Sequence, residues 1–424
     1  MEPVTLQGIF RDHFDTYARG RTLPLRILKA AHAIVQCRSP ALGGHVQHCP
    51  LGHVAHIQYH PCRHRSCPQC SRLPRAQWAE NQAARLLACD HYHVVFTLPH
   101  ELLRLWEVNR APMASALFQA ARETLMTLLQ DERFLGATPG LLMTLHTWGR
   151  TLSHHPHVHC LVTGGGITPG GDWRTVQNGY LLPVRMVAAL FRGKLLAFIQ
   201  TGLREDTLRL PPSITANDWA RTLQTLYRQK WNVCLKERYP HGQGVMRYLA
   251  RYVKGGPIGD SRLRTANAER VVFAYRDHHD GRHKTLALTT PEFIARLLWH
   301  VPEPGQHTVR HAGLYATACA PQHARARDAL GQPPKTAMDI SWQAALSRLG
   351  QHNKTLCPRC GQRLVRGARL ARSFARNENS IFKAVPSGFA QHGVQADTPN
   401  VLWLTGTGPP HVSDIFLSGG VQLN

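Results

Sequence analysis

Apolar residues recur at every third or fourth position through much of the first 36 residues, and this spacing predicts helices there. The same periodicity predicts further helices at 73–89, 111–130, 182–203, 217–239, 245–256 and 291–301. Runs of β-branched or aromatic residues that end at Pro or Gly predict strands at 91–99, 141–150, 157–166, 270–277 and 284–290. Residues 37–71 show little periodicity, so something other than an apolar core must fold them.

This mixture of helices and strands predicts an α+β chain of two or three domains, at roughly 100–200 residues per domain. Hydrophobic residues make up 43% of the chain, which is enough to bury a core and excludes a fully disordered chain. No apolar run approaches the ~18 residues of a membrane span. The N-terminus also lacks the basic-then-apolar layout of a signal peptide, so we expect no membrane association and a cytoplasmic location.

The charge balance of the chain indicates a polyanionic partner. Lys and Arg number 50 against 26 Asp and Glu, which gives a formal net charge of +24. A charge of this size favours nucleic acid as the partner, and a basic protein with no such partner is the weaker alternative.

Cysteines and histidines with metal-ligand spacing cluster near the N-terminus. Two-residue gaps such as that between Cys67 and Cys70 let two thiolates reach one ion, and structural Zn²⁺ takes four such ligands. Five candidates compete for the four places: Cys49, His53, Cys62, Cys67 and Cys70.

The alternative of free, buried cysteines is disfavoured because arginines and a histidine interleave the cluster. We expect Arg63 and Arg65 to face DNA phosphates from this module. Cys37 is either a ligand of a second site or a buried thiol. The pair Cys357 and Cys360 is half of another zinc knuckle whose partners the sequence does not identify.

His157 and His159 lie two positions apart in a predicted strand, so they project from the same face. Two imidazoles and a third ligand can hold a divalent cation with open positions for a phosphate oxygen. The pattern alone is weak, because a chain with 27 histidines contains His-x-His by chance roughly twice.

Tyr248 and Tyr252 are four residues apart in a predicted helix, so they share a face. Two amphipathic tyrosines on a surface helix are an equally good interpretation of this pair in isolation. A phenol has a pKa of about 10, so a metal and nearby cations such as Arg251 and Lys254 are needed to make it a nucleophile. Attack on a phosphodiester would give a phosphotyrosine and a free 3′-hydroxyl, which conserves bond energy for rejoining.

These motifs together resemble the rolling-circle, two-tyrosine transposases of bacterial insertion sequences, members of the His-hydrophobic-His endonuclease superfamily. The residues that carry the resemblance follow the family's order over about half the chain: CRHRSCPQC (62–70), HVVFTLP (93–99), HPHVHCLVTGGG (155–166) and YLARYVKGGPI (248–258). The resemblance implies an N-terminal zinc-binding helical module followed by a central antiparallel, palm-like sheet with flanking helices. It assigns 1–90 to the zinc module, 91–320 to the catalytic domain and 321–424 to a C-terminal tail.

The resemblance also implies roles for individual residues. His157 and His159 match the catalytic metal pair, for Mg²⁺ or Mn²⁺, and Tyr248 and Tyr252 match the nucleophiles. The substrates implied are single-stranded DNA at the element's ends and target DNA, near the nucleoid, with no nucleotide cofactor. Many relatives have Cys-x-x-Cys where this chain has Cys49-Pro-Leu-Gly-His53, so His53 is a substitute ligand. For the third ligand of the catalytic metal, His155 and Gln243 are the candidates.

Two other functions fit parts of the sequence. A plasmid or phage replication initiator, or a relaxase, would use the same chemistry in another setting. A zinc-dependent DNA-binding regulator would use the charge and the zinc module without catalysis. Trp148 and Trp231 are candidates for stacking on DNA bases, although core positions are the favoured interpretation for both.

Overall fold

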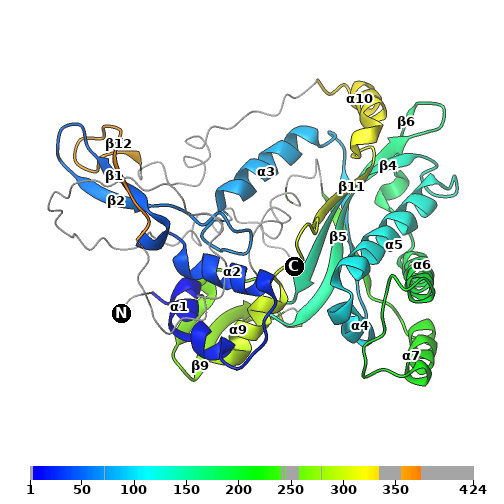
Figure 1. Ribbon diagram of the computed structural model, residues 1–424. Coiled ribbons are helices and arrows are strands. Elements are labelled where there is room, and N and C mark those ends of the chain that lie inside the picture. The colour runs from blue at the N-terminus through cyan, green and yellow to red at the C-terminus, as the bar shows by residue number, and fades with distance from the viewer. Residues whose placement is uncertain are drawn as a thin grey trace. The chain divides into compact units, whose positions relative to one another are not determined.

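The computed structural model describes residues 3–70, 72–239, 244, 257–277, 279–333 and 355–373. These residues form two compact units. The first is built from the described parts of Met1–Leu73, Ile258–Leu298 and Ile340–Asn424, and the second from those of Pro74–Pro257 and Trp299–Asp339. Both units are therefore discontinuous in sequence, and each is described by itself (Figure 1).

The first unit begins with two amphipathic helices, α1 (Leu6–Ala18) and α2 (Leu25–Gln36). Thr5 caps α1 by accepting a hydrogen bond from the Gly8 amide at 3.0 Å, which satisfies one of the free amides of the first turn. The helices bury one apolar stripe each, with Phe10 and Phe14 on α1 and Ile34 on α2. The helical pattern of the first 36 residues is thus confirmed.

Two three-stranded antiparallel sheets complete the first unit. One has the order β12-β1-β2 and joins strands from the two ends of the chain: β1 (Gly44–His48), β2 (Ala55–Tyr59) and β12 (Val365–Leu370). The other has the order β10-β9-β8 and is followed by a helix: β8 (Leu263–Ala266), β9 (Arg270–Arg276), β10 (His283–Thr289) and α9 (Thr290–Trp299). Phe273 on β9 packs against Phe293 on α9, with ring centroids 5.9 Å apart.

A six-stranded antiparallel sheet forms the centre of the second unit, and the predicted palm-like α+β fold is confirmed. Its order is β11-β4-β5-β3-β7, with β6 paired to β5. The strands are β3 (His91–Thr97), β4 (Thr138–Trp148), β5 (His154–Ile167), β6 (Trp173–Thr175), β7 (Val233–Tyr239) and β11 (Val309–Gly313). Successive residues of each strand face opposite sides of this sheet.

The apolar face of this sheet is covered by helices. Val94, Met143 and Val158 pack there into a core with α5 (Arg110–Gln130) and α6 (Val184–Arg204) (Figure 1). The other α-helices among the described residues of this unit are α3 (Arg72–Arg85), α4 (Leu103–Val108), α7 (Ala216–Arg228) and α10 (Ala320–Ala329). Because one strand face is packed in this way, the alternate residues of β3, β4 and β5 face away from α5 and α6.

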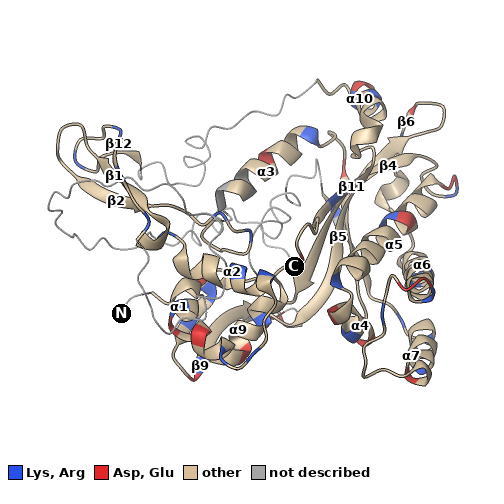
Figure 2. Ribbon diagram, in the orientation of Figure 1, with Lys and Arg blue, Asp and Glu red and all other residues tan. Residues whose placement is uncertain are grey.

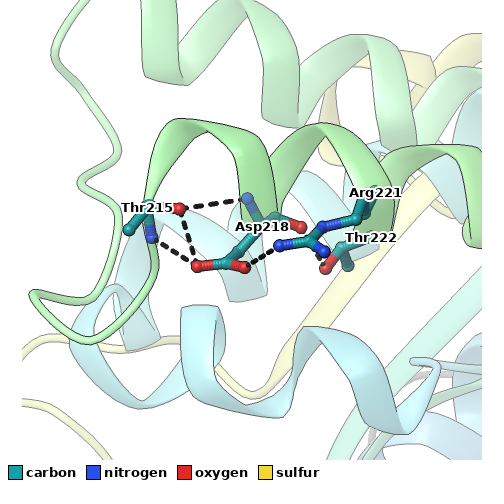
Figure 3. A network of polar contacts seen from close by, with 4 residues as sticks. All are labelled: Thr215, Asp218, Arg221 and Thr222. Atoms are coloured by element: carbon teal, nitrogen blue, oxygen red, sulfur yellow. Dashed lines mark hydrogen bonds and ion pairs between the residues drawn. The ribbon is translucent and has the colours of Figure 1, made fainter.

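Helix α7 starts at a complete capping box (Figure 3). The Thr215 hydroxyl oxygen accepts from the Asp218 amide at 3.2 Å, and the Thr215 amide donates to the Asp218 carboxylate at 3.1 Å. Arg221 donates to the same carboxylate at 2.8 Å. This arrangement satisfies amides that the first helical turn leaves unpaired.

One expectation from the sequence is corrected. A single helix at 217–239 is wrong, because α7 ends at Arg228 and residues 233–239 form strand β7, which pairs with the edge of β3. Sheet pairing and the burial of Val233 outweigh helical spacing there. The expected domains at 1–90, 91–320 and 321–424 stay a prediction. The described parts of Pro74–Pro257 and Trp299–Asp339 form one compact unit with the central sheet, and those of Ile258–Leu298 and Ile340–Asn424 belong to the unit of the N-terminal helices.

Helix α6 is long and apolar enough to cross a membrane by length and composition alone, and core helices of globular domains share this character. Val187, Phe191, Leu195 and Ile199 lie along its buried side and belong to the core of the second unit. The apolar character of α6 is therefore explained by packing against α5 and the sheet.

Candidate metal centres and catalytic site

Three histidines converge on the sheet face opposite α5 and α6. His146 lies on β4, and His157 and His159 lie on the neighbouring strand β5, where His157 is paired directly with His146. One ring nitrogen from each of the three lies within 4.8 Å of the others. Nitrogens bound to one ion at about 2.1 Å are at most about 4.2 Å apart, so small side-chain rotations suffice to bind a cation.

Hydrogen bonds orient two of these rings. Nδ1 of His157 donates to the backbone carbonyl of His155 at 2.6 Å, which leaves Nε2 of the neutral ring as a free lone pair. Nδ1 of His159 lies 2.7 Å from Nε2 of His93 on β3. For His159 to bind a metal through Nε2, Nδ1 must carry the proton and donate to His93. His93 is therefore positioned to fix the tautomer and the orientation of a metal ligand.

Burial keeps the cluster uncharged. It lowers the pKa of His157 to about 3, and it holds the pKa of His146 and His159 well below the usual histidine value. Repulsion between neighbouring imidazoles adds to this effect. All three rings are neutral near pH 7, which is the protonation state that binds a metal.

His146 was not predicted as a metal ligand from the sequence, although the predicted strands contain the information that identifies it. The predicted strands at 141–150 and 157–166 are joined by a short connection, and pairing them as a hairpin brings His146 opposite His157. Of the two candidates named for the third ligand, His155 is exposed and is not part of the three-residue group. Gln243 lies outside the described residues.

The predicted nucleophiles Tyr248 and Tyr252, with the neighbouring cations Arg251 and Lys254, also lie outside the described residues. Their distance from the histidines therefore stays a prediction.

Trp148 and Trp231 lie in two different environments. Trp231 is buried in the core against Phe191, whereas Trp148 is half-buried and stacks on His146 at 5.1 Å.

Four cysteines form a second candidate metal centre in the first unit, at the C-terminal end of α2 and in the loop after β2. They are Cys37, Cys62, Cys67 and Cys70. The Sγ atom of Cys70 lies 3.3 Å from that of Cys37 and 3.5 Å from that of Cys62. Four sulfurs around Zn²⁺ at about 2.3 Å are about 3.8 Å apart, so these distances match a tetrahedral zinc site within a few tenths of an ångström.

Hydrogen bonds from residues other than the four cysteines connect this centre to helix α1. Gln7 on α1 donates to the carbonyl of Cys37 at 2.7 Å and accepts from Gln69 at 2.7 Å. The neighbouring sulfurs of Cys37 and Cys62 raise the pKa of the Cys67 thiol, because several thiolates cannot share this space without a cation. A bound Zn²⁺ would supply the charge that keeps all four deprotonated.

The structure divides the five zinc candidates from the sequence between two groups. Cys62, Cys67 and Cys70 lie with Cys37, whereas Cys49 and His53 lie with the C-terminal pair Cys357 and Cys360. The predicted set of four ligands from these five residues is not one of the groups, and which residues bind zinc stays a prediction. Cys37 could not be assigned because it is 25 residues before the nearest of its partners, and α2 and β2 must fold to bring it there.

Exposed arginines lie in the segments that carry the first unit's candidate metal centres. Arg63 and Arg65 are exposed in the loop of the four-cysteine centre, as expected for phosphate contacts. The segment 355–373 carries five exposed arginines and no acidic residue, and Figure 2 draws no red position along it. These are Arg359, Arg363, Arg366, Arg369 and Arg372. None of them was singled out from the sequence.

Comparisons with known proteins match both units. The family model described as "Transposase zinc-binding domain" matches residues 9–98, and the model described as "Putative transposase" matches residues 140–323. The chain is 36% identical to the "Putative transposase y4qJ" of Sinorhizobium fredii, over 84% of this chain and 92% of the relative. It is 31% identical to the "Transposase for insertion sequence element IS801" of Pseudomonas savastanoi, over 68% of this chain and 70% of the relative.

Among solved structures, the metal-bound complex of the conjugative relaxase TrwC with oriT DNA aligns with 38% of this chain and 70% of its own. The sequence identity is 14% and the TM-score is 0.21, which is too low to support a functional comparison.

Proposed function

Because this chain belongs to the family of insertion-sequence transposases, we propose that it nicks and rejoins single-stranded DNA at the ends of its element through a covalent phosphotyrosine. The observation that carries this proposal is the convergence of His146, His157 and His159 on one side of the central sheet. Three neutral imidazoles with open coordination positions suit a cation that binds phosphate oxygens.

The proposed step uses one tyrosine, Tyr248 or Tyr252. Its phenolate oxygen attacks the scissile phosphorus, the bond to the 3′ oxygen breaks, and that oxygen takes up a proton to leave a 3′-hydroxyl. Arg251 and Lys254 stabilise the phenolate. His146, His157 and His159 would hold a divalent ion, which would supply Lewis-acid polarisation of the phosphate, and their imidazoles suit Mn²⁺ better than Mg²⁺. The reverse attack by a 3′-hydroxyl on the phosphotyrosine rejoins a strand without a nucleotide cofactor.

Exposed arginines of the first unit are proposed to bind the DNA backbone. Arg63 and Arg65 flank the four-cysteine centre, and the arginines of 355–373 lie on and around β12. Such contacts bind phosphates without reading sequence, so they suit both element ends and target DNA. Binding to the nucleoid follows from the same contacts.

The test is an adduct assay on single-stranded oligonucleotides that carry the element's ends, with Mn²⁺ or Mg²⁺. We expect a denaturant-resistant protein–DNA adduct that is lost in the Tyr248→Phe/Tyr252→Phe double variant and in His157→Ala. The matched controls are Tyr180→Phe and His100→Ala, whose side chains are exposed. An adduct that persists in the double variant would refute the tyrosine assignment.

The family assignment favours a transposase over a replication initiator or a relaxase, and over a regulator without catalysis. The adduct assay distinguishes a regulator from a transposase, a replication initiator and a relaxase, because only the regulator forms no covalent bond to DNA.

A further inference from the structure

We propose that Cys49, His53, Cys357 and Cys360 bind a second zinc ion, which clasps strand β12 to the N-terminal part of the chain. The two halves of this site are separated by 304 residues between His53 and Cys357 and by 311 between Cys49 and Cys360. Both halves nevertheless belong to the first unit.

The distances between the four ligand atoms fit one tetrahedral ion. Sγ of Cys49 lies 3.6 Å from Sγ of Cys360 and 3.8 Å from Nδ1 of His53, which lies 3.9 Å from Sγ of Cys357. The edge of a tetrahedron around zinc is about 3.8 Å for sulfur ligands at 2.3 Å. A disulfide between Cys49 and Cys360 would require a separation near 2.05 Å, and both thiols are free.

Each half of the site is a tight turn that aims its two ligands to one side. The Cys49 amide donates to the Val54 carbonyl at 2.9 Å, and the Cys357 amide donates to the Gln362 carbonyl at 2.7 Å. Both turns contain a glycine in the left-handed region, Gly52 and Gly361, each with a φ of 71°. This is the local geometry that lets two nearby side chains reach one ion.

Hydrophobic burial does not account for the attachment of β12. Four of its six residues are exposed and none is buried, although it is paired with β1 along its length. The pairing is close, since a Cβ on Gly43 would lie 2.7 Å from the Leu370 carbonyl oxygen. Strand β12 is this exposed and is separated from β1 by some 300 residues of chain, so its pairing needs another source of stability. A metal crosslink at the N-terminal end of β12 supplies it.

The second ion also has a consequence for DNA binding. The strand that it clasps is the one that carries Arg366 and Arg369. The zinc would therefore fix the position of a cationic strand on the first unit. The residues matched by the zinc-binding family model, 9–98, contain only two of the four ligands, so that domain alone does not complete this site.

The first test uses the unaltered full-length protein and measures thiol alkylation by peptide mass spectrometry. Cys360 is exposed, so without a metal it would react at least as fast as the half-buried Cys319. We expect Cys360 and Cys357 to be protected until a strong zinc chelator is added, while Cys319 reacts equally with and without the chelator. Rapid alkylation of Cys360 in the zinc-loaded protein would overturn the proposal.

The second test measures zinc per chain by native mass spectrometry. We expect the Cys357→Ser/Cys360→Ser double variant to hold one zinc ion fewer than the unaltered protein and than Cys319→Ser. The Cys67→Ser variant should keep Cys357 and Cys360 protected from alkylation, since the two centres share no ligand. An equal number of zinc ions in the double variant and the unaltered protein would contradict the second site.

Hydrogen exchange shows whether the ion holds strand β12 in place. In the double variant, we expect faster exchange of the amides of β12 and β1, with unchanged exchange in α5 of the second unit. Equal protection of β12 in both proteins would mean that the metal does not hold this strand.

Discussion

His93 supports a metal ligand without belonging to the metal site, and its replacement by leucine tests the geometry of the histidine cluster. The side chain is buried, and its Nε2 lies 2.7 Å from Nδ1 of His159. Leucine removes the hydrogen-bond partner that holds the His159 ring in the tautomer required for metal binding. It leaves the three ligands themselves unchanged.

The expected loss follows from two independent magnitudes. Removing a partner that orients a metal ligand costs roughly 10–100-fold in metal affinity. This equals about 1.4 to 2.8 kcal/mol at 1.4 kcal/mol per tenfold. Leaving a buried polar nitrogen without its partner costs about 1–3 kcal/mol, which is the same range. We therefore expect the affinity of the His93→Leu variant for Mn²⁺ to fall 10–100-fold.

The assay is calorimetric titration of Mn²⁺ into the zinc-loaded protein, with a free-metal control by electron paramagnetic resonance. The matched variant is His93→Gln, whose amide oxygen can accept the hydrogen bond from Nδ1 of His159 and should recover most of the affinity. His100→Leu, at an exposed site, should leave the affinity unchanged. An unchanged affinity in a folded His93→Leu variant would refute the role assigned to this hydrogen bond.

Three further predictions concern stability and DNA binding. Replacing the buried Trp231 by alanine should lower the free energy of unfolding by about 3–5 kcal/mol in denaturant titration, because a large core side chain leaves a cavity. Thr215→Ala should cost about 1 kcal/mol by removing the cap of α7, and Asp218→Ala should cost a similar amount if the box acts as a unit. The Arg366→Ala/Arg369→Ala variant should lower the salt dependence of single-strand DNA binding by about 1.4 in log–log slope, at about 0.7 per phosphate contact. An unaltered slope would show that β12 does not touch DNA.

The central sheet was predictable because its strands carry their own signals. The apolar runs at 91–99, 141–150 and 157–166 correspond to β3, β4 and β5, and alternation places His157 and His159 together. Strand β7 was not predictable in this way, since its identity depends on pairing with the edge of β3. Local periodicity contains no information about such a partner.

The candidate metal ligands also differ in whether local sequence identifies them. Cys67 and Cys70 are recognisable from their spacing, which is a local property of the chain. Cys37 and the partners of Cys357 depend on which segments the fold brings together, and spacing alone cannot assign them. His146 lies between these cases, because pairing the two predicted strands as a hairpin identifies it.

The most direct test of the proposed chemistry is to locate the DNA-linked residue. The protein is incubated with Mn²⁺ and a single-stranded oligonucleotide from an element end, digested, and the nucleotide-bearing peptide is sequenced by mass spectrometry. The proposed chemistry predicts one linked peptide that contains Tyr248 and Tyr252, present with metal and absent in His146→Ala and His159→Ala. A linkage to any other residue, or one that forms equally well without divalent metal, would contradict it.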